Sequence, residues 1–255
     1  IFCILHYTLF HSCCFIILEF FMQTIHDTNP LSGNMQEGVA APYDFTISEV
    51  FKEAWARTSG FKGPVLVAVL IIFLALAAIN FGTILVVGVF NMIDPALATI
   101  LTSSFKFVIS MASYPIAAGI LMMGLYRSVD AAVDYKLAFA YFSYSLPIII
   151  ATLFASLLVV LGFMLLVLPG IYLSIAYVFT LQLIIEKDMN LWQAMETSRK
   201  AVHQHWFKIF FIYALVGIIY LVSLIPLGFG LIWALPFFVV LHGVLYRRIF
   251  GIDSI

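Results

Sequence analysis

Three polar side chains interrupt long apolar stretches of the sequence: Asn80, Gln182 and His242. Burying a polar group in hydrocarbon is costly, so such residues usually bond to a neighbouring helix or line a polar pathway. No Asp or Glu falls inside these stretches, whereas ion-coupled transporters usually place a carboxylate there. The pattern favours contacts between packed helices, and a passive pathway is the alternative.

Two histidines, His203 and His205, have the residue type of metal ligands. On a helix, residues two apart point about 200° apart, and no Asp, Glu or Cys lies three or four positions away to complete a ligand set. The sequence therefore predicts no metal site. Arg199 and Lys200 lie close by and are expected to contact the headgroups of anionic lipids.

The sequence offers no motif for catalysis or for a cofactor. Neither a phosphate-binding loop nor a dinucleotide fingerprint is present, and no serine stands in a recognisable arrangement with a histidine and an acid. We therefore expect a protein that is not an enzyme and holds no cofactor.

Composition indicates lipid as the solvent of most side chains. The chain of 255 residues is 64% hydrophobic and 10% charged, with a mean hydropathy of +1.12. A soluble domain is about half apolar and about a quarter charged. The net charge of −1 gives no basic field for nucleic acid. Membrane lipids are the expected partners, and a protein partner or a homo-oligomer is left open.

Apolar runs of the length that crosses a bilayer, about 20 residues, predict an all-α polytopic membrane protein. Six stretches qualify or nearly qualify, and their pairing predicts three hairpins. The predicted spans are 65–90, 107–125, 146–168, 170–185, 209–227 and 231–246. Turns are expected at Pro169-Gly170 and at Gly228-Phe229-Gly230.

Basic residues predict the orientation of these spans. Every Lys and Arg except Lys106 falls before the first span, between the even and odd spans, or after the sixth. The positive-inside rule then places both termini in the cytoplasm. Lys106 is expected to extend out of the bilayer, with Asp94 as a candidate partner.

The polar and terminal segments divide the rest of the chain. Residues 1–21 are apolar but lack a basic n-region, so we expect a non-native upstream extension, with translation from Met22; an extra hydrophobic segment is the alternative. Residues 22–43 are expected to be a flexible polar tail. Residues 44–251 form the predicted six-helix transmembrane domain, and 252–255 form a C-terminal tail.

Short amphipathic segments precede the hairpins and suggest an internal repeat. Thr46 to Glu49 has the form of a capping box, followed by an amphipathic helix that is expected to lie in the membrane interface. A similar segment starts at Asn190, and Ile47 aligns with Leu191. The second and sixth spans both end in Leu-Tyr-Arg, and a weaker middle copy lies near 130–144. We interpret these as three units of interfacial helix plus hairpin.

Three motifs carry a family resemblance: Phe51-Lys52-Glu53-Ala54-Trp55, Leu168-Pro169-Gly170-Ile171-Tyr172, and Leu227-Gly228-Phe229-Gly230-Leu231 with Pro236. Over about residues 44–251 the chain resembles the YciC-type bacterial inner-membrane proteins, which have no assigned biochemical role. It is also similar to the membrane domain of some glycerophosphodiester phosphodiesterases. The resemblance implies a six-helix inner-membrane protein. It carries no catalytic or ligand residues.

Three functions are compatible with the sequence. The first, which we favour, is a non-enzymatic membrane scaffold or envelope-homeostasis protein. The second is a transporter of small molecules or lipids. The third and least favoured is an intramembrane enzyme. A water-filled cavity lined by Asn80, Gln182 or His242 would favour the second, and a dry packed bundle would favour the first.

Overall fold

The computed structural model describes residues 43–226 and 228–252, so the predictions for residues 1–21 and for most of the polar tail lie outside the described residues. Within these ranges the chain is helical, with no β-strand. The elements in chain order are α2 (Ile47–Thr58), α3 (Lys62–Ile93), α4 (Pro95–Ser128), η1 (Tyr135–Tyr144), α5 (Ser145–Leu165), α6 (Val167–Ala176), α7 (Thr180–Glu186), α8 (Leu191–Gln204), α9 (Trp206–Leu224) and α10 (Leu231–Phe250).

Six helical segments of the described chain are long and apolar enough to cross a membrane, as the sequence predicts. They are α3, α4, η1 with α5, α6 with α7, α9 and α10. The protein is therefore an all-α, multi-pass membrane protein built from three helical hairpins.

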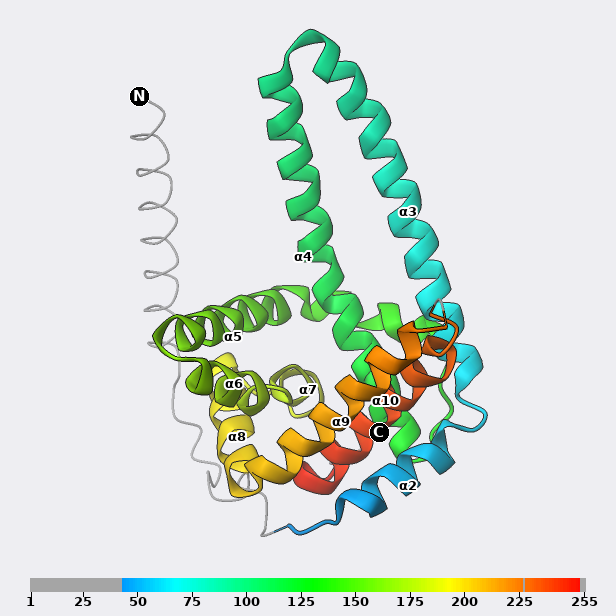
Figure 1. Ribbon diagram of the computed structural model, residues 1–255, viewed down its shortest axis with the longest axis vertical. Helices are drawn as coiled ribbons and strands as arrows, with labels where there is room; N and C mark the ends of the chain where they lie inside the picture. The colour runs from blue at the N-terminus through cyan, green and yellow to red at the C-terminus, as the bar shows by residue number, and fades with distance from the viewer. Residues whose placement is uncertain (1–42, 227, 253–255) are drawn as a thin grey trace. The chain divides into compact units, whose positions relative to one another are not determined.

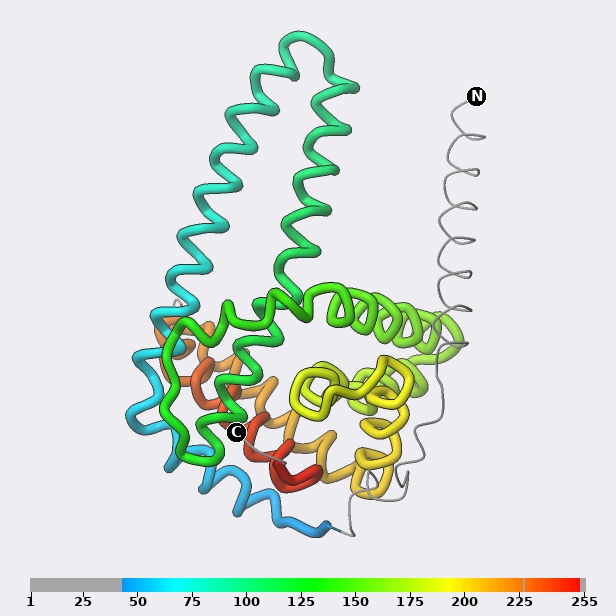
Figure 2. Tube along the Cα trace, turned by 180° about the vertical axis from the view of Figure 1, so that it is seen from behind, coloured from blue at the N-terminus to red at the C-terminus, as the bar shows by residue number. Residues whose placement is uncertain are grey.

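The second span is much longer than predicted. Helix α4 contains 34 residues and so extends about 51 Å, against about 30 Å of bilayer hydrocarbon. The predicted span begins only at residue 107, because the serines and threonines in the first turns of α4 interrupt the apolar run. In the structure their hydroxyls donate to the carbonyl four residues earlier, which satisfies them inside a helix that continues through them. The residues are Thr99, Thr102, Ser103 and Ser104. Helices α3 and α4 form a long hairpin that extends beyond the other described helices (Figures 1 and 2).

The turn between the third and fourth spans differs from the prediction. The chain reverses at Leu166, whose backbone is extended, and Pro169-Gly170 lies inside the first turn of α6. Proline is tolerated there because the first helical amides have no intrahelical partner. Gly170 serves packing instead, because a Cβ at this position would overlap the ring of Phe163. The other predicted turn is confirmed, with Gly228 at φ +83° between α9 and α10.

Helix starts follow the sequence signals in part. Asn190 caps α8, accepting a hydrogen bond of 3.0 Å from the Gln193 amide. The predicted capping box at Thr46 does not form, because the Thr46 side chain makes no cap bond and Glu49 pairs with Arg248 at 3.5 Å. The Arg248 guanidinium draws the Glu49 carboxylate away from the helix start, which accounts for the Glu49 half of the capping box.

Burial supports the internal repeat. The buried residues of α2 and α8 match at one constant spacing, pairing Val50, Ala54 and Thr58 with Ala194, Ser198 and Val202. Three buried residues also recur at equal intervals on α4, α7 and α10: Met122, Gln182 and His242. The 3-10 helix η1 occupies the place of the amphipathic helix in the middle unit.

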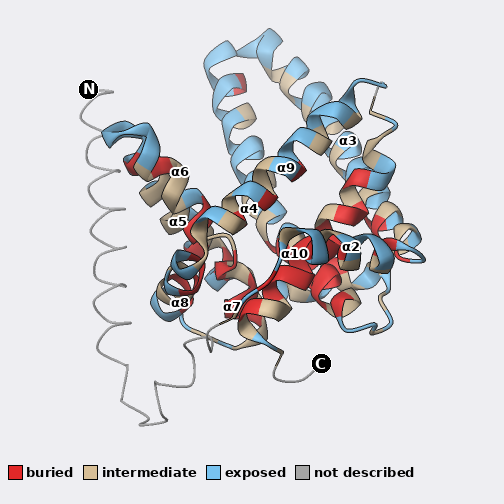
Figure 3. Ribbon diagram, turned by 60° about the horizontal axis from the view of Figure 1, so that its bottom comes forward, coloured by how far each residue is buried: buried red, intermediate tan, exposed pale blue. Residues whose placement is uncertain are grey.

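The core is centred on α10, which packs against α2, α4 and α9. Buried residues gather on α10 and the adjoining part of α4, whereas α3 is largely exposed (Figure 3). Helix α2 runs antiparallel beside α10, because Glu49 lies near Arg248 while Trp55 lies near Phe237. The apolar face of α2, expected to rest in the interface, is therefore covered by protein.

Candidate functional site

The three polar residues predicted at membrane depth do not lie together. Asn80 is exposed on α3 and donates a 2.7 Å hydrogen bond to the Leu76 carbonyl of its own helix. Gln182 and His242 are both 1% exposed within the bundle. A single site lined by all of them is therefore not formed.

Gln182 and His242 each bond to a neighbouring helix. The Gln182 amide of α7 donates to the Leu121 carbonyl of α4 at 3.4 Å. A hydrogen bond of 2.6 Å joins His242 Nδ1 on α10 to the Tyr213 hydroxyl on α9. Phe179 packs on the His242 ring, with centroids 5.1 Å apart. These contacts couple α4 to α7 and α9 to α10.

Each of these two side chains also carries a buried atom without a partner among the described residues, namely Gln182 Oε1 and His242 Nε2. The imidazole therefore depends on Tyr213 for its one hydrogen bond. A buried polar group that loses its partner is destabilising by about 1–3 kcal/mol.

Tyr213→Phe is expected to destabilise the folded protein by about 1–2 kcal/mol, because it leaves both ring nitrogens of His242 unbonded. Thermal unfolding of the detergent-purified protein measures the effect. Tyr220→Phe on the same helix is the control, because the Tyr220 hydroxyl makes no hydrogen bond among the described residues and its ring meets Phe238 edge-on. Equal stability of the two variants would contradict the role assigned to Tyr213.

Asp94 does not pair with Lys106 in the structure. Its carboxylate accepts from the Ala96 and Leu97 amides at 2.8 and 3.4 Å and so caps α4. Lys106 is exposed and forms no ion pair within the described part of the chain.

The two cations predicted to contact lipid headgroups share an acidic partner on α8. Arg199 binds Glu196 through Nε at 2.9 Å and Nη2 at 2.8 Å, and Lys200 Nζ lies 3.3 Å from the same carboxylate. The hydrogen bond from Arg199 holds the pKa of Glu196 below its usual range. This surface therefore offers a lipid less positive charge than the sequence suggests.

Glu196→Gln is expected to raise the affinity of the protein for anionic vesicles about fivefold, because it removes the charge that offsets one of the two cations. Vesicle co-flotation of the detergent-purified protein measures the affinity. Arg199→Gln combined with Lys200→Gln should lower the affinity. An unchanged affinity in both variants would contradict headgroup contact at α8.

His203 and His205 bind separate partners rather than one ion. His203 Nδ1 lies 3.1 Å from the Tyr172 hydroxyl, and His205 Nε2 lies 2.6 Å from the Tyr43 carbonyl. The described residues contain no group of three His, Cys, Asp or Glu side chains that could hold a metal.

The chain just before α2 is anchored on the corner between α8 and α9. The Tyr43 hydroxyl donates to the Ala201 carbonyl at 2.7 Å, and Lys208 Nζ binds Asp44 at 2.5 Å. Burial raises the pKa of the Tyr43 phenol. Residue 43, predicted as the end of a flexible tail, is thus held by the folded domain.

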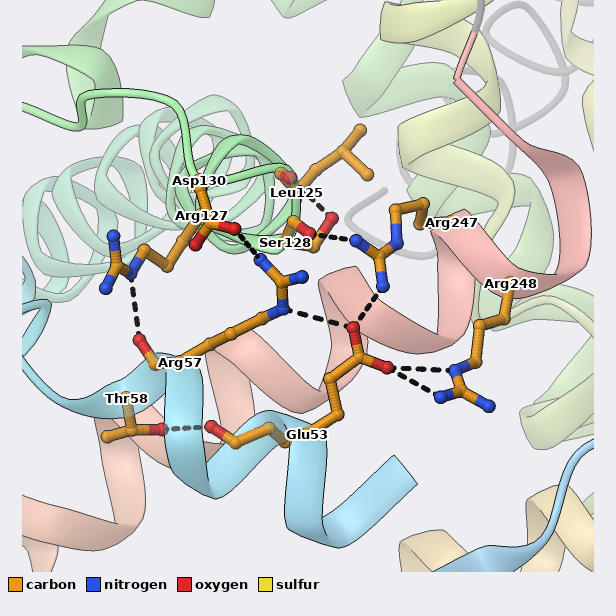
Figure 4. Close-up of polar contacts among 10 residues, drawn as sticks. Glu53, Arg57, Thr58, Leu125, Arg127, Ser128, Asp130, Arg247 and Arg248 are labelled. Atoms are coloured by element: carbon orange, nitrogen blue, oxygen red, sulfur yellow. Dashed lines mark hydrogen bonds and ion pairs between the residues drawn. The ribbon is translucent and has the colours of Figure 1, made fainter. Parts of the chain in front are cut away.

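The largest polar assembly among the described residues was not predicted as a site. Glu53 on α2 accepts hydrogen bonds from Arg57 at 3.0 Å, from Arg248 at 3.0 and 2.7 Å, and from Arg247 (Figure 4). Arg57 also binds Asp130 at 2.6 Å. We call these five residues the arginine cluster. It fastens α2 to α10 and to the end of α4.

Two further arginine contacts tie the ends of helices together beside this cluster. Arg247 donates to the Ser128 carbonyl at the end of α4. Arg127 donates to the carbonyls of Arg57 and Ser59 at 2.8 and 2.9 Å. The repeated Leu-Tyr-Arg ends were the sequence signal for these contacts. The sequence could not identify Glu53 as the partner of Arg247, because α2 is distant in the chain.

Comparisons of this chain with protein-family models, curated proteins and solved structures find no match.

Proposed function

We propose that this chain is a non-enzymatic scaffold of the bacterial inner membrane, with both termini in the cytoplasm. It engages lipid or a partner through the outward polar faces of its amphipathic segments, because their apolar faces pack within the protein. The observation that carries the proposal is the arginine cluster. Its four charged side chains on α2 and α10, with Asp130, connect the first amphipathic helix to the last span. Polar chemistry at this end of the helices thus serves to hold the elements together.

Orientation and compartment are supported by charge. Arg127 and Arg247 lie at the ends of the second and sixth spans, and Lys187 follows the fourth. Such a bias indicates a cytoplasmic face. Resemblance to the YciC-type proteins supports the bacterial inner membrane.

Fusions of a reporter to each end test the orientation. Alkaline phosphatase, which is active only outside the cytoplasm, should be inactive at both termini, and green fluorescent protein should fluoresce at both. Activity of the phosphatase at either end would overturn the proposed topology.

A transporter is the second candidate, and a specific observation favours it. Gln182 and His242 keep Oε1 and Nε2 buried and unbonded among the described residues, as groups awaiting a polar solute would be. Flux of small solutes into proteoliposomes separates the two candidates. A scaffold leaves the vesicles as tight as protein-free ones. A rate that falls in Gln182→Leu would favour transport and overturn the scaffold proposal.

A further inference from the structure

A groove opens where α2 turns into α3. It has a volume of about 140 Å³ and is lined by Trp55, Thr58, Ser59 and Lys62. A cavity that holds one water needs about 10–15 Å³ by the same measure, so the groove accommodates a group the size of a lipid phosphate with its ester oxygens. Gly60, at φ +80°, lies in the turn between α2 and α3.

Lys62 lines this groove, Arg127 bonds to another residue of its lining, and neither has a carboxylate partner among the described residues. Lys62 and Arg127 form no ion pair within the described residues, unlike the arginine cluster nearby. Arg127 Nη2 donates to the carbonyl of Ser59, a lining residue, at 2.9 Å, which holds the guanidinium beside that residue. Its Nη1 has no bond among the described residues. Two such donors are suited to a phosphate.

Apolar surface adjoins the cations. Lys62 Nζ lies 5.5 Å from the centroid of the Trp233 ring, and the Trp55 side chain is 64% exposed. Tryptophan is favoured at the level of the lipid headgroups. Beyond the groove, α3 presents exposed apolar side chains such as Val67, Leu70 and Leu74. A ligand with a phosphate at one end and acyl chains at the other matches both surfaces.

We propose that the groove binds the headgroup phosphate of an anionic phospholipid through Lys62 and Arg127, with its acyl chains along α3. The site deepens the scaffold function and rests on it. It also differs from the surface of α8, where Arg199 and Lys200 form ion pairs with Glu196.

Native mass spectrometry of the full chain in detergent tests the site, with phosphatidylglycerol and phosphatidylcholine of identical acyl chains as probes. The wild-type protein should retain phosphatidylglycerol more tightly. Lys62→Gln and Arg127→Gln should each weaken that binding about fivefold. Lys52→Gln is the matched control, because Lys52 lies on α2 outside the groove lining and should bind like the wild type.

Three results would overturn the site: wild-type affinity in Lys62→Gln, an equal loss in Lys52→Gln, or displacement of the lipid by inorganic phosphate alone. The last would indicate a free phosphate ligand. Because Arg127 also bonds to the end of α2, a melting curve accompanies each variant, and Lys62→Gln decides the matter should Arg127→Gln unfold. If the protein shows no preference for phosphatidylglycerol and its proteoliposomes remain impermeable to solute, the site is refuted and the scaffold function stands. If the proteoliposomes pass solute and the lipid preference is retained, the scaffold function is refuted.

Discussion

Replacing Gly243 with valine is expected to destabilise the protein by about 3 kcal/mol or more, because the new side chain forces two closely packed helices apart. Helix α10 crosses α4 at Gly243 and Gly124, backbone against backbone. A Cβ at Gly243 would overlap the Gly124 carbonyl and the Leu125 amide. Backbone atoms cannot move aside as a flexible side chain can, so the helices must separate.

The cost is large because these helices carry the core. Of the residues of α10, most between Phe237 and Tyr246 are buried, and they pack against the C-terminal part of α4. In lipid there is little hydrophobic force between apolar helices, and close packing at small residues drives their association. A wider crossing would lose these contacts along both helices.

The measurement is thermal unfolding of detergent-purified Gly243→Val, followed by size-exclusion chromatography. Gly217→Ala in α9 and Gly82→Ala in α3 are the controls, because a Cβ at either meets no atom within 4 Å. Both controls should be at least as stable as the wild type, because Ala favours a helix interior over Gly. A Gly243→Val protein with the same unfolding temperature as the controls would refute the close crossing of α10 and α4.

Much of this fold could be predicted from the sequence because lipid leaves a strong compositional record. Apolar runs located all six spans. The alignment of Ile47 with Leu191 matched positions on α2 and α8 that are buried in both helices. Boundaries were less predictable where side-chain hydroxyls bonded to their own helix, as Thr99 does, because hydropathy counts such groups as polar. Local hydrogen bonding removes that polarity.

Several contacts at the candidate sites join residues that are distant in the chain, and no local pattern encodes these. Hydropathy identified Gln182 and His242 as buried polar residues, but it could not separate them from Asn80, which lies on an exposed face. Arg199 and Lys200 were predicted to contact lipid headgroups, but Glu196 binds both; it lies three and four residues before them, the spacing of ion pairs on a helix. Pairs of residues distant in the sequence, such as Glu53 with Arg248, can be identified only once the folded structure is known.

Glu53→Gln is expected to destabilise the protein by about 2–3 kcal/mol, the second large effect. The Glu53 side chain is 19% exposed and accepts from three guanidinium groups. A neutral amide would leave these like charges close together without a counter-charge, and α2 would lose its fastening to α10. Glu49→Gln is the control, because Glu49 is 60% exposed and makes one pair at 3.5 Å, so its loss should be under about 1 kcal/mol.

The effect should also depend on pH in a defined direction. Partial burial raises the pKa of Glu53, but hydrogen bonds and charge from Arg248 and Arg247 outweigh it and hold the pKa below its ordinary value of 4.5. A carboxyl whose pKa is lower in the folded state stabilises that state at neutral pH, and the contribution is lost as pH falls below about 4.5. Unfolding curves of the wild type and Glu53→Gln should therefore converge between pH 7 and acid. A difference that stays constant over this range would show that the Glu53 charge does not hold α2 to α10.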